Sequence, residues 1–289
     1  MPRGVPKAGY RKTKARVARM ALEPTGPLDV VTNETDAEIR QKLADRFDIL
    51  SDMTTAALDN DIKALIVSGP AGLGKSFTVE EKLNTVDDAR KIVIRGMVNK
   101  TGLYKTLYQY RHPGCVVVFD DADRIFFDDD SLNMLKAVCD TMKERRLSYL
   151  SEFKLVDEES AEVIPKQFVF EGTIVFITNY DFDDMIGRGH KIAPHLEALV
   201  SRSHYIDLAM KTRRDYMIRI HQVVEDHGML RAHGLNEKQE REVMEIIDKH
   251  QDKLRELSLR IAIKIANLAK SRPKKWQKMA RVTCCKGVA

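Results

Sequence analysis

Two kinds of hydrophobic pattern divide the chain. Residues 36–58 carry apolar side chains at helical spacing, and further along, short β-rich runs alternate with segments long enough for crossover helices. The apolar side of the first predicted helix holds Ile39, Leu43, Phe47, Ile49 and Leu50. The β-rich runs cover residues 64–67, 92–94, 115–119, 173–178 and 204–206. Five strands alternating with helices predict an α/β fold with a parallel sheet sandwiched by helices.

From about residue 210 the pattern becomes wholly helical, and it predicts a small all-helical subdomain. We therefore expect a basic arm at residues 1–30, an α/β core at 31–208 and the helical subdomain at 209–289. Alternating residues flank an acidic tip within segment 147–172, which indicates a β-hairpin inserted in the core. A crossover helix is predicted from the spacing of Leu132, Leu135, Val138 and Met142.

The net charge of +5 hides a strong asymmetry between the ends and the middle of the chain. Residues 1–20 hold seven Lys or Arg and no acid, residues 260–289 hold nine and no acid, and the middle is acidic. No run of uncharged apolar residues is long enough to span a bilayer, and the N-terminus lacks an apolar signal region. The four cysteines have no metal or redox spacing. We expect a cytoplasmic protein with reduced thiols and no membrane partner.

The stretch "SGPAGLGKS" follows the first predicted strand and fits the phosphate-binding pattern G-x-x-x-x-G-K-[ST]. Its glycines let successive N–H groups point at phosphate oxygens, and the helix that begins at Lys75 adds its positive end. Lys75 would reach the β- and γ-phosphates of ATP, and Ser76 would bind Mg²⁺. The expected nucleotide-binding residues are Gly69, Pro70, Ala71, Gly72, Leu73, Gly74, Lys75, Ser76 and Phe77.

A second stretch, "VVVFDDAD", sets three carboxylates directly behind a β-rich run. Beside a phosphate loop, the first acid after the strand holds the Mg²⁺, which makes Asp120 the metal ligand together with Ser76. Asp121 is then placed to polarise the attacking water, and Asp123 to play a structural role. The alternative is a solvated acidic turn after a buried strand.

With these motifs the chain resembles the AAA+ ATPase family, and in particular small phage-type members with a hairpin before the sensor 1 strand. The resemblance covers about residues 45–270 and rests on an ordered series: "GPAGLGKS", "VVVFDDAD", "TIVFITNYD", "LEALVSRSHYIDL" and "ELSLRIAIKIANLAK". It implies a sheet in the order 5-1-4-3-2 followed by a helical lid. One departure is Asp121, where most members have Glu, and its shorter side chain implies slow turnover or a need for tight closure.

The resemblance also implies three further roles. Asn179 would contact the γ-phosphate or the attacking water, Arg202 would act as an arginine finger in the neighbouring subunit's site, and Arg260 would report the nucleotide to the lid. A finger given to a neighbour implies a homo-oligomer, most often a hexamer in this family. The simpler alternatives are a turn-forming Asn, surface salt bridges for Arg202 and its rival Arg188, and a solvated helix face for Arg260.

What the ATPase acts on stays open between three hypotheses. The basic ends, with Trp276 among cations, favour a motor or loader on DNA. A protein-remodelling chaperone is the second, for which Lys100, Tyr104 and Lys105 are candidate pore residues unless they belong to an ordinary amphipathic helix. The third is a nucleotide-controlled scaffold that hydrolyses ATP slowly. The acidic hairpin tip around Asp157 would repel DNA phosphates.

Overall fold

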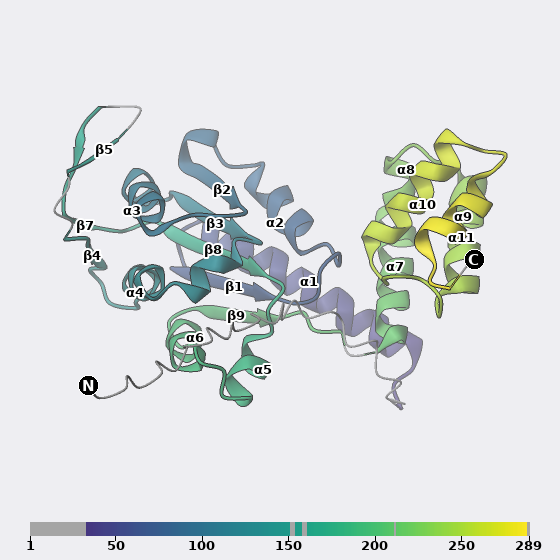
Figure 1. The fold of residues 1–289 in the computed structure, drawn as a ribbon, viewed down its shortest axis with the longest axis horizontal. Coiled ribbons are helices and arrows are strands. Elements are labelled where there is room, and N and C mark those ends of the chain that lie inside the picture. The colour runs from purple at the N-terminus through teal and green to yellow at the C-terminus, as the bar shows by residue number, and fades with distance from the viewer. Residues whose placement is uncertain (1–32, 151–153, 158–160, 211, 288–289) are drawn as a thin grey trace, which may run out of the picture.

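The computed structural model describes residues 33–287, apart from 151–153, 158–160 and 211, so the predicted arm at residues 1–30 lies outside the described residues. The described chain forms an α/β core followed by a group of helices (Figure 1). The helices of the core are α1 (Asp36–Leu58), α2 (Lys75–Leu83), α3 (Lys100–Gln109), α4 (Asp129–Val138), α5 (Phe182–Gly187) and α6 (Ala193–Val200), with two 3₁₀ turns, η1 (Asp88–Arg90) and η2 (Asp123–Phe127).

Five parallel strands make the central sheet, in the order β2-β3-β8-β1-β9. These strands are β1 (Ala64–Ser68), β2 (Lys91–Arg95), β3 (Val116–Asp120), β8 (Thr173–Thr178) and β9 (His204–Asp207). Numbered by their sequence order within the sheet, they run 5-1-4-3-2, as expected. In this order β8 lies between β1 and β3, so the phosphate loop and the acidic stretch end at the same edge with only β8 between them.

Side chains of the inner strands alternate between two hydrophobic cores because successive residues of a strand point to opposite faces. Ile66, Phe119 and Phe176 pack with α3, α4 and α6 on one face. Val67 and Val118 pack with α1 and α2 on the other. The sheet is thus sandwiched, as the continuous apolar runs predicted.

Helix α1 has the predicted bounds because Thr35 and Glu38 form a capping box at its start. The assignment of Ile49 to the apolar side of this helix is wrong, because Ile49 is 53% exposed. The predicted crossover helix also extended too far, since α4 ends at Val138 and Met142 is exposed beyond it.

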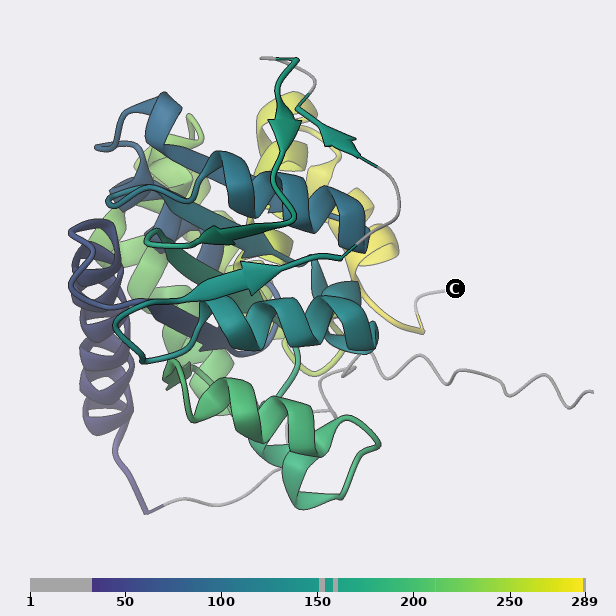
Figure 2. The same cartoon turned by 90° about the vertical axis from the view of Figure 1, so that its left-hand side faces the viewer.

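The inserted segment 147–172 lies at the end of the core farthest from the C-terminal helices (Figure 1), and Figure 2 is drawn from that side. It contains two antiparallel ladders. The first pairs β4 (Arg146–Ser148) with β7 (Gln167–Val169), and the second pairs β5 (Leu155–Val156) with β6 (Val163–Ile164). Tyr104 of α3 is fully buried against this hairpin and donates to the Pro165 carbonyl, so the interpretation of Tyr104 as a pore residue is wrong.

The C-terminal helices form a separate hydrophobic cluster, which we call the lid. They are α7 (Arg213–His227), α8 (Met229–Ala232), α9 (Glu237–His250), α10 (Leu259–Ser271) and α11 (Trp276–Cys284). Trp276 is 4% exposed and packs inside this cluster, so it pins α11 to the lid and cannot stack on a base. None of the described helices combines the length and the apolar character needed to span a membrane.

Candidate functional site

The loop from Gly69 to Gly74 joins β1 to α2 at the carboxyl edge of the sheet. Gly74 precedes α2 with a φ of 100°, a left-handed conformation that glycine adopts at little cost, and it provides no side-chain cap. The first N–H groups of α2 therefore have no capping side chain, and together with the helix dipole they favour an anion at this point.

Lys75 is the buried cation of this loop, at 5% exposure. Its Nζ donates to the carbonyl oxygens of Gly69 at 2.5 Å and Pro70 at 2.8 Å, and to Oδ1 of Asn179 at 2.9 Å. Burial lowers the pKa of Lys75 to about 8, against the opposing attraction of Asp121. A polyphosphate beside Lys75 would raise this pKa again and favour the charged amine.

Ser76 and Asp120 supply a pair of adjacent oxygens. The Ser76 hydroxyl donates to Oδ1 of Asp120 at 2.8 Å, and the other carboxylate oxygen accepts from Nε of Arg95 at 2.9 Å. Arg95, at the end of β2, also pairs with Glu80. Mg²⁺ prefers a few protein oxygens completed by water and phosphate. The absence of a larger cluster of metal-type side chains among the described residues is compatible with that arrangement, so Ser76 and Asp120 fit the ion.

A short relay links Lys75 to the second acid of the stretch. Asn179, directly after β8, accepts from Lys75 through Oδ1 and donates through Nδ2 to Oδ1 of Asp121 at 2.7 Å. Asp121 has a φ of 54° and its N–H donates to the Ile177 carbonyl, which turns the carboxylate toward Asn179. Burial raises the pKa of Asp123 to about 6, and its Oδ1 is buried without a hydrogen bond. The three aspartates thus differ in surroundings.

The lid contacts the phosphate loop directly. Ser258 caps α10, and the following Leu259 N–H donates to the Gly72 carbonyl at 2.8 Å. Gly72 has a φ of 77°, and a Cβ placed on it would lie 2.7 Å from the Cβ of Ser258. Only glycine allows this approach, which brings Arg260 of the same helix against the loop.

Between loop and lid lies a cavity of about 660 Å³, of a size that suits a nucleotide. Eight predicted residues line it: Gly72, Gly74, Lys75, Ser76, Phe77, Asp121, Asn179 and Arg260. Leu73 turns its side chain into the core instead, so it can offer only its backbone. Gly69 and Pro70 meet the site through the carbonyls that hold Lys75.

The two candidate finger arginines lie outside this cavity. Arg202 follows α6, where its Nε pairs with Asp140 at 3.2 Å and a terminal nitrogen donates to the Ala198 carbonyl. Arg188, directly after α5, forms an ion pair with Asp184, which lies four residues earlier in α5. Neither arginine belongs to the site of its own subunit. The role of Arg202 as an arginine finger in a neighbouring subunit's site stays a prediction.

Several residues that line the cavity were not predicted from the sequence, among them Phe47, Arg219 and Gln222, and neither was Arg95 beside Asp120. Phe47 was assigned to the core, where it also belongs. Arg219 left a signal, because it lies on α7 at helical spacing between the apolar residues Tyr216 and Val223. An arginine on an apolar helix face marks a buried polar contact. Arg95, the last residue of β2, gave no such signal in the sequence.

The sheet order, the phosphate loop and the docked lid are features typical of P-loop proteins of the AAA+ class. The chain belongs to the same family as the uncharacterized 36.7 kDa protein of the nrdC-mobD intergenic region of Enterobacteria phage T4, to which it is 34% identical over 250 residues, covering 86% of this chain and 76% of that one. No protein-family model matches the chain.

Two solved structures of low sequence identity are similar to parts of this one. The Thermotoga maritima RuvB Holliday junction branch migration motor has a TM-score of 0.41 at 12% identity, with 86% of this chain and 69% of that chain covered. NtrX from Brucella abortus in complex with ADP has a TM-score of 0.43 at 12% identity, with 78% and 50% covered.

Proposed function

We propose that this protein is a magnesium-dependent ATPase of the AAA+ class that works as a homo-oligomer on DNA. The observation that carries the proposal is the convergence of Lys75, Ser76, Asp120, Asn179 and Asp121 at one sheet edge beneath a lid. ATP with Mg²⁺ would supply the electrophilic phosphorus of its γ-phosphoryl group. The chain's own groups would then bind, orient and exclude water.

Each group has a distinct part in hydrolysis. The N–H groups of the loop and Lys75 would hold the phosphates, and Ser76 with Asp120 would hold the magnesium ion. Asp121 accepts a proton from the water that attacks phosphorus, while the bond to the leaving oxygen of ADP breaks. Asn179 keeps Asp121 in place through the hydrogen bond to Oδ1. The lid, which donates from Leu259 to the Gly72 carbonyl, would limit the access of bulk water to the site.

A finger arginine from the neighbour would complete the site, and a mixing experiment tests this. Arg202→Ala should abolish hydrolysis and spare ATP binding, whereas Lys75→Ala should lose both. When the two inactive variants are mixed, an intact Lys75 faces an intact Arg202 at some interfaces, so activity should return. No recovery in mixtures that demonstrably assemble, or full activity of a monomer, would contradict the shared site.

The DNA role is supported by exposed cations in the turn between α10 and α11 and on α11. Lys274, Lys275 and Lys278 are exposed, and no ion pair between described residues includes them. Changing all three to Gln should weaken DNA binding uniformly across sequences and reduce the slope of its salt dependence by up to about 3. Lys166→Gln, at an exposed hairpin position, is the control.

ATPase assays decide between the remaining hypotheses. A rate stimulated by DNA supports the DNA motor or loader. A rate indifferent to DNA but raised by a protein partner supports remodelling, although the burial of Tyr104 removes its predicted pore tyrosine. Assembly on ATP with negligible turnover supports the scaffold, for which the short Asp121 side chain is the favouring observation.

A further inference from the structure

Arg219 of the first lid helix is a buried cation that lacks a counter-ion. It is 5% exposed and lies among the residues that line the nucleotide cavity. Its guanidinium carbon lies 3.4 Å from the centroid of the Phe47 ring on α1. One terminal nitrogen donates to Oε1 of Gln222 at 2.8 Å, and Nε is buried without a hydrogen-bond partner. A charge held in this way costs free energy unless a negative group compensates it.

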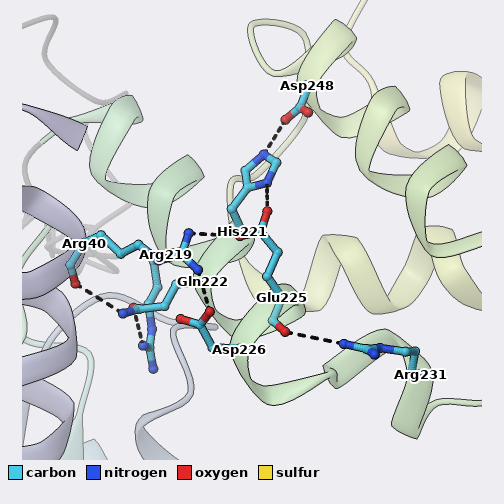
Figure 3. A network of polar contacts seen from close by, with 8 residues as sticks. All are labelled: Arg40, Arg219, His221, Gln222, Glu225, Asp226, Arg231 and Asp248. Atoms are coloured by element: carbon cyan, nitrogen blue, oxygen red, sulfur yellow. Dashed lines mark hydrogen bonds and ion pairs between the residues drawn. The ribbon is translucent and has the colours of Figure 1, made fainter. Parts of the chain in front are cut away.

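The nearest carboxylates do not provide that compensation. Asp226 attracts Arg219 through space, but it accepts from Arg40 of α1 at 2.6 Å, so its charge is already paired (Figure 3). Asp48 is exposed on α1 and forms no ion pair with Arg219. Burial lowers the pKa of Arg219 to about 10, so the guanidinium keeps its charge at neutral pH. The cation therefore faces the cavity with no acid of this chain bound to it among the described residues.

The direction of the side chain indicates what would bind it. A terminal nitrogen of Arg219 lies 3.8 Å from the position that a Cβ on Gly74 would take. Gly74 precedes α2, where the phosphate loop ends and where helix N–H groups favour an anion. The lid cation and the phosphate cradle thus face each other across the same cavity, on elements far apart in the sequence.

We propose that Arg219 binds a phosphate of the nucleotide at the end of the loop nearest Gly74, as a second lid cation distinct from Arg260. The proposal rests on the nucleotide binding proposed above and extends it to the first lid helix. It would also couple closure of the lid to nucleotide binding. Docking α7 on α1 buries Arg219 on Phe47 and lets Gln222 donate to the Arg40 carbonyl at 3.2 Å. That arrangement is disfavoured electrostatically until a phosphate neutralises the guanidinium.

The test compares dissociation constants for adenosine, AMP, ADP and ATP, measured by competition against a fluorescent ATP analogue. Arg219→Met keeps an unbranched apolar side chain that reaches about as far as Nε of the arginine, and it removes the charge. Because hydrogen bonds to charged groups contribute about 1.5–3 kcal/mol, affinity for the phosphorylated ligands should fall about tenfold to a hundredfold, and affinity for adenosine should hold within about twofold. Arg219→Lys should recover part of the loss. Arg241→Met, at an exposed position of α9, is the matched control and should change nothing.

Each outcome has a definite meaning. An equal loss for adenosine and its phosphates would show that Arg219 acts only by packing on Phe47, and no loss for any ligand would show that it does not contact the nucleotide; both overturn the proposal. Thermal unfolding provides a second readout, because the unliganded Arg219→Met protein should melt at the wild-type temperature or above it and lose most of the upward shift caused by ATP. If the wild-type protein binds no ATP with magnesium, the proposed function fails instead.

Discussion

The two walls of the nucleotide cavity are built in different ways. The core wall comes from short segments at the ends of adjacent strands, where Lys75 donates to Asn179 at 2.9 Å and Ser76 donates to Asp120 at 2.8 Å. The lid wall comes from helices whose polar residues, Arg219 and Arg260, depend on docking against the core for their positions. Backbone and sheet geometry therefore hold the chemistry, whereas side-chain packing controls access. Changes in the core wall should affect catalysis most, and changes in the lid wall should affect closure.

The largest effect is expected at Asp121. Asp121→Asn keeps the shape and removes the proton acceptor, so turnover should fall about 10²- to 10⁴-fold while ATP binding changes little. Asp123→Asn is the comparison, because burial already raises the pKa of Asp123 toward the neutral form, and it should cost less than about tenfold. Phosphate release measures both. An Asp121→Asn variant that hydrolyses ATP at the wild-type rate would remove Asp121 from the mechanism.

Lys75→Ala should come next. Loss of its charge from the loop should weaken ATP binding about a hundredfold or more, since Lys75 is the buried cation directed at the phosphates. Lys82→Ala, on the same helix but outside the cavity, should bind ATP normally. Equilibrium titration with a fluorescent nucleotide measures the difference. Equal affinities of the two variants would mean that the core wall does not bind phosphate.

The contact between the walls is tested by Gly72→Ala. The new Cβ would clash with Ser258 and strain a left-handed residue, so the lid should fail to dock and ATP affinity should fall about tenfold. Gly189→Ala also has a positive φ but has no atoms within 4 Å of the added Cβ, so it should lose only about 1 kcal/mol of stability and no affinity. Nucleotide titration and chemical denaturation separate the two effects. Normal binding by Gly72→Ala would show that the docked lid is not needed.

The smallest effect belongs to His221 of α7, which faces Asp248 of α9 (Figure 3). Burial opposes its protonation, but hydrogen bonds of 2.8 Å to Asp248 and 3.1 Å to Glu225 raise its pKa above the ordinary value. Its stabilisation is therefore complete below about pH 6.5 and is lost as the pH rises through the raised value. Between about pH 5.5 and 8.5 the wild type should lose up to about 1 kcal/mol more stability than His221→Gln. Identical pH profiles in urea denaturation would contradict this.

The core wall could be predicted from the sequence because its information is local. A phosphate loop needs glycines, a lysine and a hydroxyl at adjacent positions, and the metal acid follows a run of apolar β-formers. The strands at 64–68 and 116–120 were predicted to within a residue at each end for the same reason, since continuous apolar runs mark strands buried on both faces. The resemblance to the AAA+ class added the position of β8 between them, which brings Asn179 to Lys75.

Only the tertiary structure decided what lies on the lid wall and which apolar or aromatic residues are available to a ligand. Tyr104 and Trp276 are residue types that often contact ligands, yet both are buried. Tyr104 lies beneath the hairpin, and Trp276 lies inside the lid. Arg219 packs on Phe47, which lies more than 170 residues away in the sequence, and no local sequence pattern predicts this contact. The sequence by itself determined the phosphate-binding residues, because the loop and the strand ends are local structures. The docking of α7 on α1 decided which lid residues reach the cavity, because the burial of a side chain depends on which helix faces pack together.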